Sequence, residues 1–178
     1  MDKREQILNI ATELFSENGF EKTPISAICE GANVSKGLVF HHFKNKDILL
    51  REIFVRTTEI IGELNREQAR ISDPRQRLAA LIESIFASMI EHRKLYQFNL
   101  NVLLQPTTRA ILSDLIEERA TMLLETTEDI FSQLSKDNSR VLSHLFIAEI
   151  DGTAMNYLFS YDAFPLMLIK DELIKKYS

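Results

Sequence analysis

The residues whose types suggest chemistry are concentrated between Ser35 and Lys46, in the stretch SKGLVFHHFKNK. This stretch contains three lysines and two histidines but no acidic residue, although the whole chain has a formal net charge of -5. The residues before it, TPISAICEGANVS, have the pattern of a short helix followed by a tight turn. In a helix-turn-helix, the helix after such a turn lies in the major groove of DNA. The stretch therefore predicts a DNA-binding surface.

Charge is unevenly distributed along the chain. Residues 1–56 contain eight Lys/Arg and eight Asp/Glu, whereas residues 57–178 contain thirteen and eighteen. A DNA duplex attracts lysines and repels an acidic surface. The composition therefore predicts that the N-terminal part binds DNA and that the rest is held away from it.

Other chemistries have little support. The four histidines, His41, His42, His92 and His144, lack the i, i+4 spacing of a metal site, and no phosphate-binding glycine loop or nucleophile motif is present. We expect no metal, no cofactor and no enzymatic activity, although a catalytic triad scattered along the chain stays an open alternative.

Three further features concern the location of the protein. The single cysteine, Cys29, cannot form an internal disulfide, and no apolar run reaches the roughly 18 residues that suggest a membrane span. The N-terminus, MDKREQIL, has no apolar signal-peptide core. We expect a cytoplasmic protein without a membrane partner.

The elements that must position the basic stretch are predicted to be helices, because apolar residues recur at helical spacing and no alternating run indicates a strand. The predicted fold is therefore all-α. The expected helices cover 2–18, a segment starting at Pro24, a segment following Ser35, a segment from Asn45 to Ser72-Asp73-Pro74, and then 74–92, 94–104, 107–134, 139–161 and 165–177.

Local signals define several helix ends. Thr23 followed by Pro24 predicts an N-cap with proline at the first helical position. Asn33 is predicted to adopt a positive φ where the chain turns sharply. Ser35 and Asn45 are predicted to cap the next two helices.

With these elements in place, the first 56 residues resemble the TetR family of bacterial transcriptional regulators. The resemblance rests on ELFSENGF, TPISAICEGANVSKG, FHHF and KNKDILL. More weakly, EIDGTAMNYL and YDAFPLMLIKDELI resemble the last two helices of the family. The resemblance to this family implies a three-helix DNA-binding domain, here residues 1–46 packed on the start of the fourth helix. It also implies a larger C-terminal helical domain, here residues 47–178, for effector binding and dimerisation.

The resemblance further implies a homodimer whose third helices enter successive major grooves of a palindromic operator, about 34 to 36 Å apart. Lys36 and Lys46 would neutralise phosphates, and Leu38 would touch a thymine methyl. Two departures from the family remove polar groups: Phe40 replaces the usual tyrosine, and Pro24 replaces a threonine. The residues expected on DNA are Ile25, Ser35, Lys36, Gly37, Leu38, Phe40, His41, His42 and Lys46.

An effector cavity is predicted in the C-terminal helices, for a small and largely apolar molecule. Its candidate lining residues are Phe86, Met89, His92, Tyr96, Phe98, Asn99, Met122, His144, Phe146, Asn156 and Tyr157, although each could equally be ordinary core or surface. Gly152 inside a helix suggests close helix approach. The predicted dimer interface is Gly152, Ala154, Leu166, Ile169 and Leu173, with a crossing inside one chain as the alternative.

Together these patterns predict a TetR-like repressor that leaves its operator when an effector binds. A different class of function stays open. The helix-turn-helix surface could instead bind another protein, which would make the chain a coactivator, and the outward Leu38 and Phe40 favour this alternative slightly.

Overall fold

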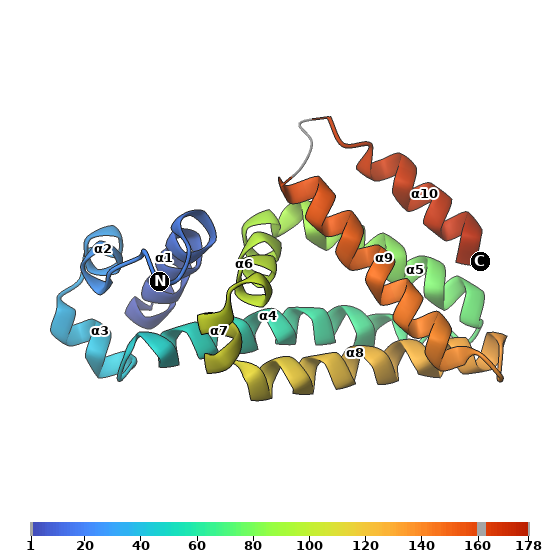
Figure 1. The fold of residues 1–178 in the computed structure, drawn as a ribbon, viewed down its shortest axis with the longest axis horizontal. Helices are drawn as coiled ribbons and strands as arrows, with labels where there is room; N and C mark the ends of the chain where they lie inside the picture. Colours follow the sequence, from blue (N-terminus) through green and yellow to red (C-terminus); the bar gives the residue numbers. More distant parts are fainter. Residues whose placement is uncertain (1, 160–162, 178) are drawn as a thin grey trace. The chain divides into compact units, whose positions relative to one another are not determined.

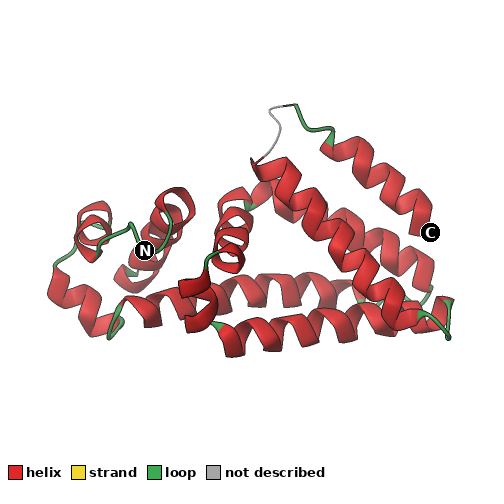
Figure 2. Cartoon of the chain, in the orientation of Figure 1, coloured by secondary structure: helices red, strands yellow, loops and turns green. Residues whose placement is uncertain are grey.

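The computed structural model describes residues 2–159 and 163–177, and within these ranges every regular element is an α-helix (Figures 1 and 2). The all-α prediction is confirmed. The helices are α1 (Lys3–Asn18), α2 (Ile25–Gly31), α3 (Lys36–His42), α4 (Lys46–Gln68), α5 (Pro74–Glu91), α6 (Arg93–Leu104), α7 (Pro106–Ile111), α8 (Ser113–Leu134), α9 (Ser139–Phe159) and α10 (Leu166–Tyr177).

The helices form two compact units. The first unit contains the residues up to Thr58 together with Lys94–Ile116, and the second contains Glu59–Arg93 and the residues from Glu117 onward. The long helix α4 contributes its first half to one unit and its second half to the other. These units do not coincide with the predicted boundary after residue 46, because α6 and α7 pack with the N-terminal helices.

The core of the first unit follows from helical periodicity. In α1, Ile7, Ala11 and Phe15 are spaced by four residues, so they lie on one face, and all three are buried. They pack in one cluster with buried residues of α3, α4 and α6, among them Val39 and Phe98. Polar contacts join α1 to α6, since the Ser16 hydroxyl donates to the Lys94 carbonyl at 2.8 Å.

The second unit is held by a separate set of apolar and aromatic contacts. Helix α10 packs against α5, and Lys170 of α10 forms an ion pair of 2.7 Å with Glu83 of α5. The rings of Phe131, Phe146 and Tyr177 meet edge to face, with centroids 5.4 to 6.0 Å apart. Such arrangements stabilise beyond the area that they bury.

Most of the predicted local signals are confirmed. Asn33 has a φ of 47°, the Ser35 side chain accepts from the Leu38 N–H at 3.2 Å, and Asn45 Oδ1 accepts from the Ile48 N–H at 2.8 Å. The prediction for α2 is wrong. Pro24 itself is the N-cap, and the Thr23 hydroxyl donates instead to the Gly19 carbonyl at 2.8 Å, because the chain folds back there onto the end of α1.

One predicted helix is in fact two. The expected segment 107–134 breaks at Leu112, where φ is -111° and ψ is 10°, so that α7 and α8 are separate. The Leu112 side chain is fully buried in the core of the first unit. No glycine or proline marks this position, and so the sequence carries no local signal for the break. Separately, the predicted end of the 139–161 helix includes residues 160 and 161, which lie outside the described residues.

Candidate nucleic-acid interface

Helices α2 and α3 form a helix-turn-helix supported by α1. The positive φ of Asn33 lets the chain reverse, and the Val34 N–H donates to the Cys29 carbonyl at 3.0 Å across the turn. Ile28 from α2 and Val39 from α3 are buried in the shared core. Because each helix is fixed by a buried apolar anchor, the opposite face of α3 is held outward rigidly.

The outward face of α3 is cationic and aromatic. Lys36, Gly37, Phe40 and His41 are exposed, and Phe40 has 38% of its surface accessible. The Lys36 ammonium lies 5.7 Å from the centre of the Phe40 ring, close enough for a cation–π contact. Within the described residues, Lys36 forms no ion pair. Its charge is therefore available to a phosphate.

Gly37 and Ser35 lie at the start of α3. A Cβ on Gly37 would meet only the Ser35 hydroxyl, at 3.8 Å, so packing inside the chain does not require glycine here. A DNA backbone could approach α3 more closely here because Gly37 has no side chain.

Lys46 lies in a different environment from Lys36. Its ammonium donates to the Phe20 carbonyl and lies 4.3 Å from the centre of the Phe20 ring. Burial lowers the pKa of Lys46, an effect partly opposed by Asp47 and Glu21. The structure thus gives Lys46 a role in holding α4 to the end of α1, and its predicted phosphate contact stays a prediction.

The remaining predicted DNA contacts are less exposed. Ile25, Leu38 and His42 are half-buried, and Ile25 packs against the core of the first unit. The rings of His41 and His42 meet edge to face with centroids 5.3 Å apart. The predicted residues from 35 to 42 lie together on or beside α3, whereas Ile25 and Lys46 flank it.

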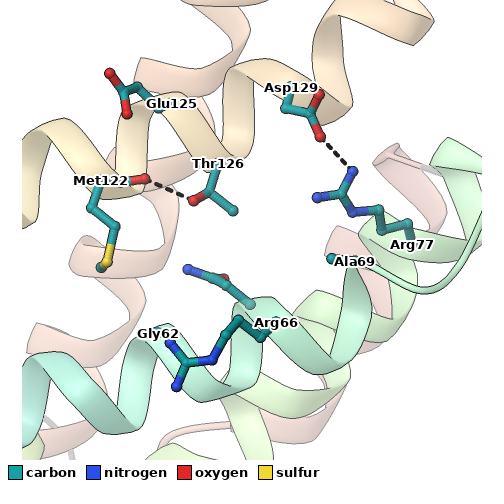
Figure 3. Close-up of a pocket in the computed structure, with 9 residues that line it drawn as sticks. Gly62, Arg66, Ala69, Arg77, Met122, Glu125, Thr126 and Asp129 are labelled. Carbon is teal, nitrogen blue, oxygen red and sulfur yellow. Dashed lines mark hydrogen bonds and ion pairs between the residues drawn. The ribbon is translucent and has the colours of Figure 1, made fainter.

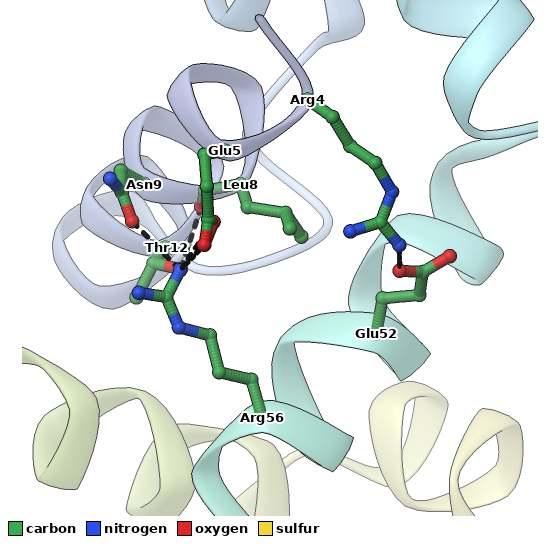
Figure 4. A network of polar contacts seen from close by, with 7 residues as sticks. All are labelled: Arg4, Glu5, Leu8, Asn9, Thr12, Glu52 and Arg56. Atoms are coloured by element: carbon green, nitrogen blue, oxygen red, sulfur yellow. Dashed lines mark hydrogen bonds and ion pairs between the residues drawn. The ribbon is translucent and has the colours of Figure 1, made fainter. Parts of the chain in front are cut away.

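Ion pairs that the sequence did not suggest fix α1 to α4 (Figure 4). The Arg4 guanidinium binds Glu52, while Arg56 reaches Glu5 at 3.2 Å and Asn9 at 2.9 Å. Arg4 also lies over the Phe43 ring, 5.3 Å from its centre. These partners are about 50 positions apart in the sequence, and so no local pattern could have paired them. They neutralise two arginines of the first unit.

Comparison with known proteins agrees with this geometry. The family model for bacterial regulatory proteins of the tetR family matches residues 7–53, which include most of α1, all of α2 and α3, and the start of α4. This N-terminal segment thus has the sequence of the TetR family. The regulator UidR of Escherichia coli is 39% identical over 71 residues, which cover 40% of this chain and 33% of UidR. The chain thus spans about a third of the length of that relative.

Solved structures share the fold of this chain over almost its whole length. FadR of Bacillus subtilis, determined in complex with stearoyl-CoA, has a TM-score of 0.80 at 20% identity, over 96% of this chain and 95% of FadR. AibR, determined with isovaleryl coenzyme A and operator DNA, has a TM-score of 0.78 at 21% identity, over 98% and 97% of the two chains. At this identity the likeness establishes the fold.

The described residues contain neither a candidate membrane-spanning helix nor a candidate metal site. None of their helices is long and apolar enough to cross a bilayer. They contain no group of three or more His, Cys, Asp or Glu side chains placed to hold a metal ion.

The predicted effector residues fall in both units of the chain. Phe86, Met89 and Phe146 are buried core of the second unit. Tyr96, Phe98 and Asn99 belong to the first unit, where Asn99 accepts from the Thr57 hydroxyl at 3.0 Å. His144 is exposed, and His92 follows the last residue of α5. Asn156 donates to the Gly152 carbonyl at 2.8 Å, and the Tyr157 ring lies under Arg93. Only Met122 lines a pocket described below.

That pocket has a volume of about 400 Å³ and lies within the second unit, between α4, α5 and α8 (Figure 3). Its lining is mostly polar, in contrast with the apolar lining expected from the sequence. The lining residues are Gly62, Asn65, Arg66, Ala69, Arg77, Met122, Glu125, Thr126 and Asp129. Sequence reasoning missed them because polar residues on long helices read as solvated surface.

The predicted dimer residues lie mainly inside the protomer. Ala154, Leu166 and Leu173 are buried, because these faces of α9 and α10 pack into the second unit. Ile169 is half-buried. Gly152 faces open space, since a Cβ built there meets nothing within 4 Å. A close helix crossing inside the chain, which was the alternative to a dimer contact at Gly152, is absent at this position.

Proposed function

We propose that this protein is a DNA-binding transcriptional regulator of the TetR family that acts as a homodimer and is released from its operator by a small ligand. The observation that carries this proposal is the exposed, cationic outer face of α3 on a rigid helix-turn-helix, inside the segment that the family model matches. No catalytic role is proposed for any residue.

A dimer is supported by an unpaired apolar face on α9. Val141, Leu145, Met155 and Phe159 are exposed large apolar residues, and they follow one another at spacings that keep them on one side of the helix. We call these four residues the α9 stripe. Gly152 lies on the same side and leaves room for a second helix to approach. Contiguous exposed apolar surface of this kind marks protein–protein interfaces.

Release by a ligand is supported by the course of α4. This helix begins directly after the helix-turn-helix and carries the pocket residues Gly62, Asn65 and Arg66 near its other end. A ligand that favours a different position of α4 needs a coupling of only about 1 to 3 kcal/mol to weaken DNA affinity roughly 5 to 150-fold. The fold of AibR, solved with a coenzyme A ester and operator DNA, is compatible with both kinds of ligand.

The test measures DNA binding by the full chain at several salt concentrations. Fluorescence anisotropy of a labelled random-sequence duplex reports the binding. We expect the logarithm of the association constant to fall linearly with the logarithm of salt concentration. Lys36→Ala should reduce the magnitude of the slope by about 1, because one phosphate contact is lost. Lys136→Ala, at an exposed position of the second unit, is the matched control and should leave the slope unchanged.

An affinity that does not respond to salt would contradict DNA binding by this face. The exposed Phe40 would then favour the second candidate, a surface for another protein. Selection of duplexes from a random pool distinguishes the two functions further, because a regulator should enrich a palindromic site and a coactivator should enrich none.

A further inference from the structure

We propose that the pocket between α4, α5 and α8 binds a small organic carboxylate. This inference deepens the proposed function, because it names the chemical class of the ligand that would act on α4. The volume of about 400 Å³ lies at the small end of the range of roughly 300 to 1,000 Å³ for ligand sites. A ligand of modest size fits such a space.

The first argument is a pair of unsatisfied donors. Asn65 Nδ2 and Arg77 Nε are both buried, and neither has a hydrogen-bond partner among the described residues. Both residues line the pocket. A buried donor without a partner is unfavourable, so native proteins rarely keep two of them in one cavity without a ligand or water to accept from them. A bound molecule that accepts hydrogen bonds from Asn65 and Arg77 would satisfy both donors.

The second argument is the fixed orientation of Arg77. Its Nη1 donates to Asp129 at 2.6 Å, and the Arg77 side chain is largely buried, so the guanidinium is held in one position. Figure 3 shows this pair at one side of the pocket. With Nη1 engaged, the Nε edge is the part left for a ligand. An arginine edge combined with an amide N–H matches the two oxygens of a carboxylate.

The third argument concerns charge. Arg66 is the other cation of the lining, and its contact with Glu63 is long, 3.8 Å, between two exposed side chains. Its guanidinium can therefore turn to a ligand at little cost. Glu125 and Asp129 offset the two arginines, so the lining carries no net charge. A single negative charge is accommodated there more readily than the double charge of a phosphate monoester.

Glu125 suggests what the rest of the ligand carries. Its carboxylate lines the pocket on α8, opposite Gly62 and Arg66 of α4 in Figure 3, and forms no ion pair within the described residues. A carboxylate that also has an amino group could satisfy both sides of the pocket. The proposal assigns a carboxylate to the ligand, and the experiment tests separately whether an amino group increases its affinity.

The experiment measures the melting temperature of the full chain against increasing concentrations of four probes: L-alanine, lactate, propionate and methyl lactate. We expect saturable stabilisation by the carboxylates, because a ligand that binds only the folded state raises its stability. Methyl lactate should have no effect, since the ester lacks the charge. A larger shift with L-alanine than with lactate and propionate would add the amino group to the assignment, and an equal shift would assign the carboxylate alone.

Two variants test the residues. Asn65→Leu removes one unsatisfied donor, so the melting temperature without ligand should be unchanged or higher. The apparent affinity for carboxylates, obtained from the concentration dependence of the shift, should fall by at least about tenfold. Arg77→Gln should abolish the shift. Arg109→Gln, at an exposed position of α7, is the control and should behave as the wild type.

Three results would overturn the assignment: no saturable shift with any carboxylate up to about 10 mM, an equal shift with methyl lactate, or a normal shift in Asn65→Leu. A lower ligand-free melting temperature in Asn65→Leu would show that Nδ2 supports the fold and would also count against it. Because these measurements contain no DNA, their failure would leave the DNA-binding proposal standing. Loss of salt-dependent DNA binding, conversely, would leave the ligand assignment intact.

Discussion

Two lysines of the same basic stretch have different surroundings, and at the scale of single residues this difference matters most. Lys36 is exposed beside the Phe40 ring. Lys46 donates to a backbone carbonyl and lies over the rings of Phe20 and Phe15, 4.3 and 5.8 Å from their centres. A lysine with a desolvated, satisfied ammonium contributes to stability, whereas an exposed lysine contributes mainly to the field that attracts DNA.

The two lysines should therefore respond differently to truncation. Lys46→Ala should lower the free energy of unfolding by about 1 to 2 kcal/mol, because it removes a charged hydrogen bond and a cation–π contact. Lys36→Ala should leave this free energy within about 0.5 kcal/mol of the wild type, as surface substitutions do. Urea unfolding followed by circular dichroism measures both, and equal effects would contradict the distinction.

At the scale of elements, the geometry of the helix-turn-helix depends on one residue in the turn. Asn33 holds a φ of 47°, and the next N–H, that of Val34, closes the turn on Cys29. Asparagine tolerates this conformation because its short polar side chain bonds locally, whereas most residues with a Cβ are strained there.

Asn33→Ala should destabilise the protein by about 1 kcal/mol, because alanine meets the steric penalty without the local compensation. Asn33→Gly should cost less, or stabilise slightly, since glycine adopts positive φ freely. Chemical unfolding of the two variants provides the comparison. If alanine and glycine had the same effect, the strain argument for this turn would be wrong.

A second element contact joins α4 to the start of α8. Arg51 donates from both terminal nitrogens to the two oxygens of Asp114, at 2.7 and 2.6 Å, and also to the Ile111 carbonyl at 2.9 Å. These bonds lower the pKa of Asp114 from 3.8 to about 2. The pair follows the break at Leu112 and holds the first turn of α8 in place.

The sign of the pH effect follows from this lowered pKa. Because the carboxylate is favoured in the folded state, the pair stabilises the protein above about pH 4, and this stabilisation is lost as the pH falls through about 2. Asp114→Asn should melt at a lower temperature than the wild type at neutral pH, and the difference should shrink between about pH 4 and 2. Melting curves across this range test the effect, with the exposed loop variant Asp137→Asn as the control.

At the scale of the whole molecule, the apolar residues left exposed on α9 predict how two copies assemble. Two further large apolar residues are exposed on α10, Met167 and Leu168, of which Leu168 is 68% accessible. Apolar side chains this exposed gain free energy when a second copy covers them, about 25 cal/mol per Å² removed from water.

Leu145→Glu should weaken the dimer at least tenfold, since a charge would enter an apolar interface. Lys136→Glu, at an exposed position outside α9, should leave association unchanged. Sedimentation velocity at several concentrations distinguishes monomer from dimer. A dimer that persists unchanged in Leu145→Glu would place the interface elsewhere.

Loss of the dimer should also weaken binding to a palindromic site more than binding to random duplex, because only a dimer holds two recognition helices one helical turn apart. Competition between the two duplexes measures this ratio for the wild type and for Leu145→Glu. An unchanged ratio would show that a single copy reads the operator.

The sequence by itself determined the local parts of this protein. The helical class, the turn at Asn33 and the caps at Ser35 and Asn45 each depend on residues within about four positions, and such short-range patterns are readable without coordinates. The basic character of α3 was equally visible, because charge is a property of composition. The same holds for the family resemblance, which rests on contiguous motifs.

Only the tertiary structure decided the long-range parts. The pairing of Arg4 with Glu52 joins residues 48 positions apart, and the pocket brings Asn65 and Arg77 to α8. Helical periodicity predicted a helix over 139–161, but it could not show that Ala154 packs inward while Leu145 stays exposed. Which apolar face is buried depends on where the other helices pack, and that is a property of the folded chain rather than of any one segment.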